Sequence, residues 1–295
     1  MRFAPRRKLG RTDFDATLLG AGDLADAALG VDACAAVLRR ALDAGINVVD
    51  TAPAYEAGLS EQVVGRALAG RRDGIFVIDK IDHLDRPVAA QADESIARLG
   101  FSPDAFVFHG VSRMDDWNAL VSEGGGMSQL EQLRRLGRCR FRGVSSHHPD
   151  VVRAAILSGL CDVVMFAVGP HVDRRYTDEL LPLARERGVG TVCFKTFGAG
   201  KLVASTTGYG QPLPPDVDPS TLAPTLSVDD CVRVTLTHDP DVALLGLSTP
   251  GEQDAAFRAV ERFQPLSPQE LEDVRLRAAG VVRNKGEIWW DPPAS

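Results

Sequence analysis

Two acid/base side chains share one short loop near the amino-terminal end of the sequence. Asp50 directly follows the apolar run 46–49, and Tyr55 lies five residues further on, just before a helix-like stretch opens at residue 59. A β-branched run that stops at a charged residue is typical of a buried strand leaving the core. A carboxylate and a phenol at such a strand end suit proton transfer to or from a bound molecule. The alternative is structural: the aspartate caps the turn and the tyrosine packs on it.

Two further ionisable side chains end the next two strand-like runs. Lys80 ends the run FVIDK, and His109 follows the run FVF. Taken singly, such a lysine is more often a solvated charge and such a histidine a satisfied structural residue. In a barrel of parallel strands, however, consecutive strand ends are neighbours, so these side chains and the Asp50–Tyr55 loop would converge at one rim. Their joint placement favours a catalytic set.

The elements that must position these residues alternate between short apolar runs and amphipathic stretches. The runs with the length and composition of buried strands are 17–19, 46–49, 75–78, 105–108, 141–144, 163–166, 189–194 and 242–245. The stretches with helical spacing that follow them are 32–44, 60–68, 87–99, 128–136, 150–157, 177–187, 227–237 and 251–263. Eight strand-then-helix units predict an α/β fold, a closed (β/α)8 barrel, as a single domain over residues 1–295.

Further elements are predicted at the two ends of the chain and in two long loops. Residues 3–14, with a turn at Gly10, predict a small β-hairpin that covers the bottom of the barrel, and residues 267–280 predict an extra carboxyl-terminal helix that begins at Ser-Pro-Gln-Glu. The loops 109–127 and 196–226 are longer than connectivity requires. Both follow strands, so both should lie on the face where active sites form.

An alternative architecture is suggested by residues 20–25, which fit the pattern G-x-G-x-x-A after a strand. With Asp50 ending a later strand, this pattern is compatible with a dinucleotide-binding doubly wound fold. In that fold a helix begins inside the glycine motif, whereas the periodic stretch here begins near residue 32. The later strand-helix units also favour the barrel.

The overall composition is ordinary for a soluble enzyme of 295 residues, with 44% hydrophobic and 25% charged residues. The formal net charge is −7 and the basic residues are scattered, which argues against a nucleic-acid partner. The first residues are basic but lack the apolar core of a signal peptide, and no uninterrupted apolar run of about 18 residues occurs. We therefore expect a cytoplasmic protein with neither a nucleic-acid nor a membrane partner.

The cysteines are expected to be reduced core residues. They are odd in number, far apart in the sequence and form no CxxC pair. The five are Cys34, Cys139, Cys161, Cys193 and Cys231.

From residue 6 to about residue 262 the chain resembles the aldo-keto reductase family. The motifs that carry the resemblance are Leu9-Gly10-Arg11-Thr12, Gly45-Ile46-Asn47, Asp50-Thr51-Ala52 with Tyr55, Ser60-Glu61, Lys80, His109, Gly143-Val144-Ser145, and Gly246 with Ser248-Thr249-Pro250. The resemblance implies a (β/α)8 barrel that reduces aldehydes or ketones with a nicotinamide cofactor. It also implies a catalytic tetrad of Asp50, Tyr55, Lys80 and His109.

These residue types fit carbonyl reduction. Hydride arriving at a carbonyl carbon leaves negative charge on the oxygen, which must be stabilised and protonated. A free tyrosine has a pKa of about 10, and a neighbouring ammonium lowers that value. We expect Lys80 to act in this way on Tyr55, with Asp50 holding Lys80 charged and oriented. We expect His109 to hydrogen-bond the carbonyl oxygen of the substrate.

The resemblance further implies a set of cofactor-binding residues at the strand ends. They are Gly22, Asp23, Ser145, Ser146, Met165, Phe194, Lys195, Gly246, Ser248, Thr249 and Glu252. Ser146 stands where asparagine is usual and Met165 where glutamine is usual, so one amide contact is missing. Phe194 lies where an aromatic ring often stacks on the nicotinamide; the alternative is a buried strand-end residue.

The largest departures from the family pattern follow the eighth predicted strand. Glu252 stands where many members place an arginine against the adenosine 2′-phosphate, and Ala255-Ala256 stand where they place Glu-Asn against adenine. A carboxylate repels a phosphate but accepts from a ribose hydroxyl, so Glu252 favours NADH over NADPH, or weak binding of either. Arg258 and Lys201 are nearby sources of positive charge, and helix amides near residues 250–251 suit a phosphate.

The substrate is less constrained. Trp117, Trp289-Trp290, Tyr176 and His171 either wall a pocket with apolar surface or serve in packing. The adjacent His147-His148 do not point the same way on a strand or helix, so we expect no metal site.

The sequence therefore predicts an NAD(P)-dependent oxidoreductase that reduces a small carbonyl substrate. A rival hypothesis is a barrel of this family that has kept its tetrad but binds a nucleotide as a sensor or scaffold. The changes at Ser146, Met165, Glu252 and Ala255-Ala256 motivate that rival.

Overall fold

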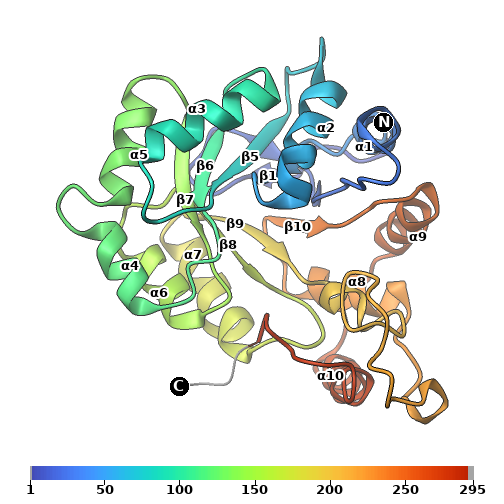
Figure 1. Cartoon of the computed structure of the whole chain (residues 1–295). Coiled ribbons are helices and arrows are strands. Elements are labelled where there is room, and N and C mark those ends of the chain that lie inside the picture. Colours follow the sequence, from blue (N-terminus) through green and yellow to red (C-terminus); the bar gives the residue numbers. More distant parts are fainter. Residues whose placement is uncertain (1, 292–295) are drawn as a thin grey trace.

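A computed structural model describes residues 2–291 and shows the predicted barrel. Its strands are parallel and close in the order β10-β3-β4-β5-β6-β7-β8-β9. Their bounds are β3 Leu19–Ala21, β4 Val48–Asp50, β5 Phe76–Ile81, β6 Ala105–Phe108, β7 Phe141–Ser145, β8 Val163–Ala167, β9 Gly190–Phe194 and β10 Val242–Leu245. Figure 1 shows helices arranged around these strands. The fold class predicted from the alternating pattern is confirmed.

The helices lie close to the predicted stretches. They are α1 Val31–Asp43, α2 Leu59–Leu68, α3 Val88–Leu99, α4 Met114–Val121, α5 Gly126–Arg135, α6 Pro149–Leu157, α7 Leu181–Glu186, α8 Val228–Thr237, α9 Pro250–Glu261 and α10 Pro268–Val281. A π-helical turn, Tyr176–Leu180, precedes α7. Helix α1 begins well after the glycine pattern at residues 20–25, which excludes the doubly wound alternative. Within residues 2–291, no helix has both the length and the apolarity needed to cross a bilayer.

The interior of the barrel is filled by one side-chain face of each strand. Phe76 and Ile78 of β5 point inward and meet Val48 of β4, with Met165 of β8 in the same cluster. Successive side chains of a strand point to opposite faces, so the intervening residues pack against the outer helices. This alternation decides which residues at a strand end face the open mouth of the barrel, formed by the carboxyl ends of the strands.

The predicted hairpin closes the opposite end. Strands β1 (Arg7–Lys8) and β2 (Asp15–Ala16) pair antiparallel, and Leu9 between them is fully buried in the interior cluster. Gly10 turns the chain with φ of +52°, and a Cβ there would lie 2.0 Å from the backbone nitrogen of Gly190. The turn therefore requires glycine for both its conformation and its contact with the start of β9.

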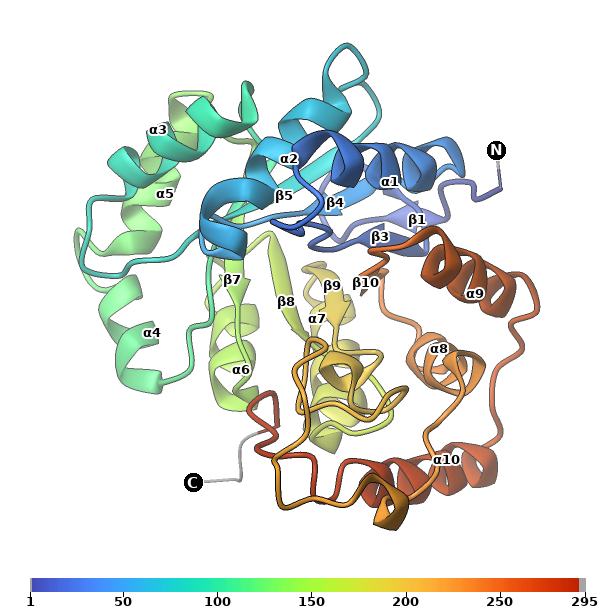
Figure 2. The same cartoon turned by 45° about the vertical axis from the view of Figure 1, so that its right-hand side comes forward.

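The two long loops differ from each other. The loop 109–127 contains α4, which is absent from the predicted elements, whereas the loop 196–226 has only two short 3-10 turns, Gly198–Gly200 and Pro219–Thr221. Figure 2 shows the second loop beside the red carboxyl-terminal segment. The Lys285 ammonium joins them by donating to the carbonyl oxygens of Lys201 at 2.7 Å and Ala204 at 2.8 Å.

The cysteines have the predicted role. All five are buried and free. Burial raises the pKa of the Cys139 thiol to about 11 and that of Cys161 to about 12. A thiol with such a pKa is a poor nucleophile at neutral pH, so these cysteines are packing residues.

Gly143 offers a test of the strand register. It pairs with Val163 between β7 and β8, and a Cβ on it would lie 1.9 Å from the Val163 carbonyl oxygen. We expect Gly143→Ala to lower the free energy of unfolding by about 1–3 kcal/mol or more, because the strands must separate. Urea titration followed by circular dichroism measures the change.

The matched control is Gly280→Ala in α10, where the nearest atom to a new Cβ is 4.0 Å away. Alanine is favoured over glycine in a helix by about 0.5–1 kcal/mol, so this variant should be at least as stable as wild type. Equal stability of the two variants would contradict the register.

Candidate active site

The predicted tetrad lies at the mouth of the barrel. Asp50 ends β4, Lys80 is the second-last residue of β5, Tyr55 begins the turn before α2, and His109 follows β6. The Lys80 ammonium forms an ion pair with the Asp50 carboxylate and donates to the Thr51 carbonyl oxygen at 2.9 Å. The two paired side chains are only 1% and 3% exposed, so the ammonium is fixed in place.

Strand alternation explains why Lys80 points inward. Phe76 and Ile78 on the same strand fill the barrel interior, and Lys80 continues that face by one more step toward the mouth. The side chains between them, Val77 and Asp79, point to the helices outside. A buried ammonium at the top of an apolar interior needs a carboxylate beside it, and Asp50 on the neighbouring strand supplies one.

Tyr55 lies above this ion pair. Its ring centroid is 5.2 Å from the Lys80 ammonium, and its hydroxyl oxygen is 3.5 Å from Nε2 of His109. The turn that carries it is strained, because Glu56 and Ala57 have φ values of 46° and 52°. Non-glycine residues adopt this region at a cost of about 1–3 kcal/mol each, so the tyrosine is held by a conformation that its surroundings enforce.

The surroundings of Tyr55 favour the protonated form of its phenol. Burial raises its pKa well above the ordinary value, and the carboxylate of Asp50 raises it further. The expected pKa below the ordinary value is not found, because burial and the nearby Asp50 carboxylate outweigh the Lys80 ammonium. The resting site therefore presents a proton donor.

His109 has a partner that the sequence reasoning missed. Its Nδ1 lies 2.5 Å from Oδ1 of Asp82, the residue that directly follows β5. The only sequence signal is an acid two residues beyond Lys80 at the same strand end.

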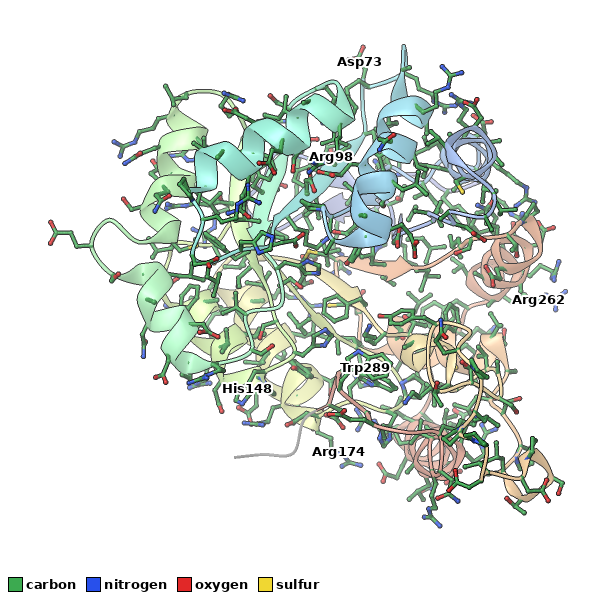
Figure 3. The ribbon with its side chains drawn as sticks, viewed as in Figure 1. Asp73, Arg98, His148, Arg174, Arg262 and Trp289 are labelled. Atoms are coloured by element: carbon green, nitrogen blue, oxygen red, sulfur yellow. The ribbon has the colours of Figure 1, made fainter. Side chains whose placement is uncertain are left out.

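A second acidic group lies on the outer side of β5. The Glu61 carboxylate of α2 is fully buried and pairs with Arg98 of α3, which Figure 3 shows between those helices. Asp79 accepts from the Lys80 backbone N–H at 2.8 Å, while its Oδ2 has no partner within residues 2–291. Burial, followed by the charge of Glu61, raises the pKa of Asp79 well above its usual range. Burial therefore favours the neutral form of the Asp79 carboxyl group behind the lysine.

The strands β3 and β10 leave their ends open beside the tetrad. Gly22 donates its N–H to the Leu245 carbonyl at 2.8 Å, and a Cβ on it would lie 3.3 Å from that oxygen. Asp23 accepts from the Ala25 N–H at 3.0 Å. Gly246 and Ser248, which follow β10, are exposed. Gly246 and Ser248 are therefore accessible to a ligand at this edge.

Two of the expected cofactor residues are engaged in the protein itself. The Ser146 hydroxyl donates to the Val111 carbonyl at 2.6 Å and accepts from the His148 N–H at 2.9 Å, while Met165 is buried in the barrel interior. Ser145, at the end of β7, is 4% exposed, and its hydroxyl has no hydrogen bond within the described part of the chain. Of these three, the Ser145 hydroxyl is the one left for a ligand.

At the start of α9, residues of the helix itself form the capping hydrogen bonds. Thr249 accepts from the Glu252 N–H at 3.2 Å, and the Glu252 carboxylate accepts from the Thr249 N–H at 3.0 Å. This reciprocal pair is a capping box. Glu252 therefore places a negative charge at a helix amino terminus and uses one of its amides. Arg258 is exposed on the same helix.

Basic and aromatic side chains line the β9 side. Phe194, half-buried, lies with its ring 5.0 Å from the ring of His147. Lys195, with φ of 71°, hydrogen-bonds the Tyr209 hydroxyl. Lys201 is fully buried and donates to the Glu287 carbonyl at 2.5 Å, so it does not provide the free charge that the sequence suggested.

The remaining aromatic candidates divide into packing and rim residues. Trp117, Tyr176 and Trp290 are buried in the outer core, and Trp290 donates to the His171 carbonyl at 3.0 Å. Trp289, labelled in Figure 3, is half-buried, and its ring centroid is 5.8 Å from that of Tyr209. Trp289 is therefore the one of the three tryptophans whose exposure would allow it to line a pocket.

Comparisons with known proteins agree with this geometry. The model of the aldo/keto reductase family matches residues 18–261. The chain belongs to the aldo/keto reductase family. By that membership it is an oxidoreductase of the NAD(P)-dependent type.

Individual relatives are distant. Pyridoxal 4-dehydrogenase of Microbacterium luteolum is 28% identical over 262 residues, covering 70% of this chain and 75% of that protein. The NADH-specific methylglyoxal reductase of Escherichia coli is 26% identical over 229 residues, covering 68% and 69%. The holo form of an aldo-keto reductase from Bacillus halodurans superposes with a TM-score of 0.71 at 25% identity, covering 95% of this chain and 99% of that chain.

In this aldo-keto reductase, the adjacent His147 and His148 do not share one set of neighbours. The two side chains have different neighbours: His147 packs on Phe194, and Nδ1 of His148 is 3.7 Å from Asp150. Within residues 2–291, no three or more His, Cys, Asp or Glu side chains are grouped to hold a metal ion.

Asp79 gives this reductase a testable pH dependence of stability. Its pKa is raised in the folded state, so its contribution is fully present below the unfolded pKa of about 4 and is lost as pH rises toward the folded value. Asparagine does not titrate and keeps the acceptor for the Lys80 N–H. We expect Asp79→Asn to gain at least about 1 kcal/mol relative to wild type between about pH 4 and 7, measured by urea unfolding.

The control is Asp73→Asn, on an exposed residue labelled in Figure 3. Its stability relative to wild type should not change over that range. A pH-independent difference for Asp79→Asn would show that the carboxyl group is ionised in the fold.

Proposed function

We propose that this aldo-keto reductase reduces an aldehyde or ketone to an alcohol, or runs the reverse reaction, with Tyr55 as the general acid or base. The observation that carries the proposal is the position of the Tyr55 phenol, within hydrogen-bond reach of His109 and directly above the buried Lys80–Asp50 pair. A protonated phenol, a fixed ammonium and an imidazole at one open rim are the groups that a developing alkoxide requires.

Each side chain has a defined part in this reaction. Tyr55 delivers its proton to the substrate oxygen as negative charge develops there. The negative charge that develops on the Tyr55 oxygen is stabilised by the Lys80 ammonium, 5.2 Å from the ring centroid. Asp50 holds the lysine charged in a site where an unpaired ammonium would be costly. The nicotinamide cofactor supplies the hydride when bound.

The open edge at β3 and β10 fits a dinucleotide. At Gly22 any larger side chain would press on the β10 backbone, and Gly246, Ser248 and Thr249 are exposed along the same edge. The unpaired Ser145 hydroxyl suits the nicotinamide amide, and Phe194 offers an aromatic face. Asp23 and Lys195 lie at the two sides of this edge. The residues present therefore support a cofactor site, with Met165 and Ser146 in structural roles beneath it.

The cofactor is NADH or NADPH, and Glu252 disfavours NADPH. Its carboxylate caps α9 and would repel a 2′-phosphate near that helix end. Arg258, exposed on the same helix, is the available counter-charge. The relative named an NADH-specific methylglyoxal reductase supports use of NADH by this chain.

The substrate class is a small carbonyl compound. The names of the two curated relatives, which refer to pyridoxal and methylglyoxal, support an aldehyde. Tyr209 and Trp289 beside Lys195 would give a substrate pocket aromatic walls.

The rival function is a nucleotide-binding sensor or scaffold. The observation in its favour is that Ser146 and Glu252 use their polar groups inside the protein. The two functions are separated by titrating the protein with NADH and NADPH side by side, following nucleotide fluorescence, and then adding a panel of small aldehydes while following absorbance. Turnover supports the reductase, binding without oxidation supports the sensor, and no response to either nucleotide contradicts both.

Tyr55→Phe tests the proton donor. The variant keeps the ring and loses the hydroxyl, so we expect carbonyl reduction to fall by at least about 10²-fold, while nucleotide affinity stays within about twofold of wild type. Initial rates and fluorescence titration measure the two quantities.

Tyr176→Phe is the matched control. Tyr176 is fully buried, and its hydroxyl has no partner within residues 2–291, so removing that hydroxyl should leave turnover unchanged. Wild-type turnover in Tyr55→Phe would remove the phenol from the reaction.

A further inference from the structure

We propose that Asp82 is a positioning residue that fixes the proton of His109 on Nδ1 and so makes His109 the proton partner of Tyr55. The inference rests on the proposed carbonyl reduction. It assigns His109 a role different from the simple hydrogen-bond donor to substrate that the sequence suggests.

The geometry places three groups in a row. Oδ1 of Asp82 lies 2.5 Å from Nδ1 of His109, and Nε2 on the far side of the ring lies 3.5 Å from the Tyr55 hydroxyl oxygen. The Asp82 side chain is 10% exposed and that of His109 is 24% exposed. The pair is therefore largely shielded from water, and the His109 ring is the more accessible of the two side chains.

Asp82 is ionised in this arrangement. Burial acts to raise its pKa, but the hydrogen bond and the charge of His109 outweigh burial, and the pKa lies below the usual range. The Lys80 ammonium acts in the same direction.

An ionised carboxylate can only accept hydrogen bonds, and this determines which nitrogen of the imidazole ring carries the proton. Nδ1 must carry a proton to bond with Asp82, so in a neutral ring Nε2 carries a lone pair and faces Tyr55 as an acceptor. Nε2 becomes a donor only in the imidazolium form. A neutral His109 therefore cannot donate to a substrate carbonyl from this side.

The proton balance of reduction follows. Hydride from the nicotinamide forms a C–H bond at the carbonyl carbon, and the C=O π electrons move to oxygen. That oxygen takes the Tyr55 proton, and the Tyr55 oxygen takes the Nε2 proton of the imidazolium. The ring ends neutral and Asp82 remains an anion. Reduction is therefore fastest when His109 is charged, and the Asp82 carboxylate stabilises that charge.

Other charged or titratable groups also face this histidine. They are Asp50 and Lys80 at the ends of β4 and β5, Tyr55 in the turn before α2, and His147 after β7. Asp50 is already paired with Lys80, and burial lowers the pKa of His147 to about 3, so His147 is neutral near pH 7. Asp82 is left as the anion that governs His109.

The experiment compares the pH profile of kcat/KM for carbonyl reduction in wild type and Asp82→Asn. Asparagine keeps an acceptor for Nδ1–H but removes the charge. We expect the alkaline fall of the profile to move down by about 1–2 pH units, with nucleotide affinity unchanged, and Asp82→Glu to restore most of the wild-type profile. Asp85→Asn, an exposed charge in the same loop, is the matched control and should leave the profile in place.

A second readout does not depend on turnover. In ¹⁵N-histidine-labelled protein, with His109 assigned by the His109→Gln variant, we expect the neutral ring to carry its proton on Nδ1 in wild type and on Nε2 in Asp82→Ala. A wild-type ring protonated on Nε2, or an Asp82→Asn profile identical to wild type, would overturn the inference. If the wild-type chain reduced no carbonyl, the proposed function would fail, and the tautomer alone would decide the role of Asp82.

Discussion

The ion pair between Lys80 and Asp50 is the interaction on which the rest of the site depends. Both side chains are almost fully buried, at 1% and 3% exposure, where a single charge would be strongly destabilising. The pair is tolerated because the Thr51 carbonyl also accepts from the ammonium. It fixes a positive charge beneath Tyr55, while burial raises the pKa of the phenol and favours its protonated form until a substrate oxygen takes the proton.

Strand β5 carries ionisable side chains on both of its faces. Its inward side carries Lys80 to the mouth above a filled barrel interior, and its outward side carries Asp79 against the buried Glu61–Arg98 pair. Directly after the strand, Asp82 turns back to His109. One short segment thus supplies the ammonium, the buried Asp79 carboxyl group behind it and the Asp82 carboxylate beside the imidazole, so small changes in its register would disturb all three.

Much of the barrel and the position of the tetrad could be predicted from the sequence, because short apolar runs and helical spacing identify strands and helices locally. Strands β6 and β10 match the predicted runs residue for residue, and the tetrad lies at the predicted strand ends. Helix α4 was missed because its eight residues lie inside a loop defined only by length. The Asp82–His109 contact was missed because spacing does not show how a loop turns back. The cap at Thr249 and Glu252 was visible as a T-x-x-E pattern, but it was interpreted only in terms of the nucleotide.

The role of the buried ion pair is tested by single-turnover hydride transfer in the double variant Asp50→Asn with Lys80→Met, together with nucleotide affinity. Removing both charges leaves no unpaired ion in the core, so the variant should fold and bind nucleotide nearly as wild type does. We expect hydride transfer in this variant to slow by at least about 10²-fold, because the charge that develops on the Tyr55 oxygen loses its ammonium. A folded, nucleotide-bound double variant that transfers hydride at the wild-type rate would contradict this role of the ion pair.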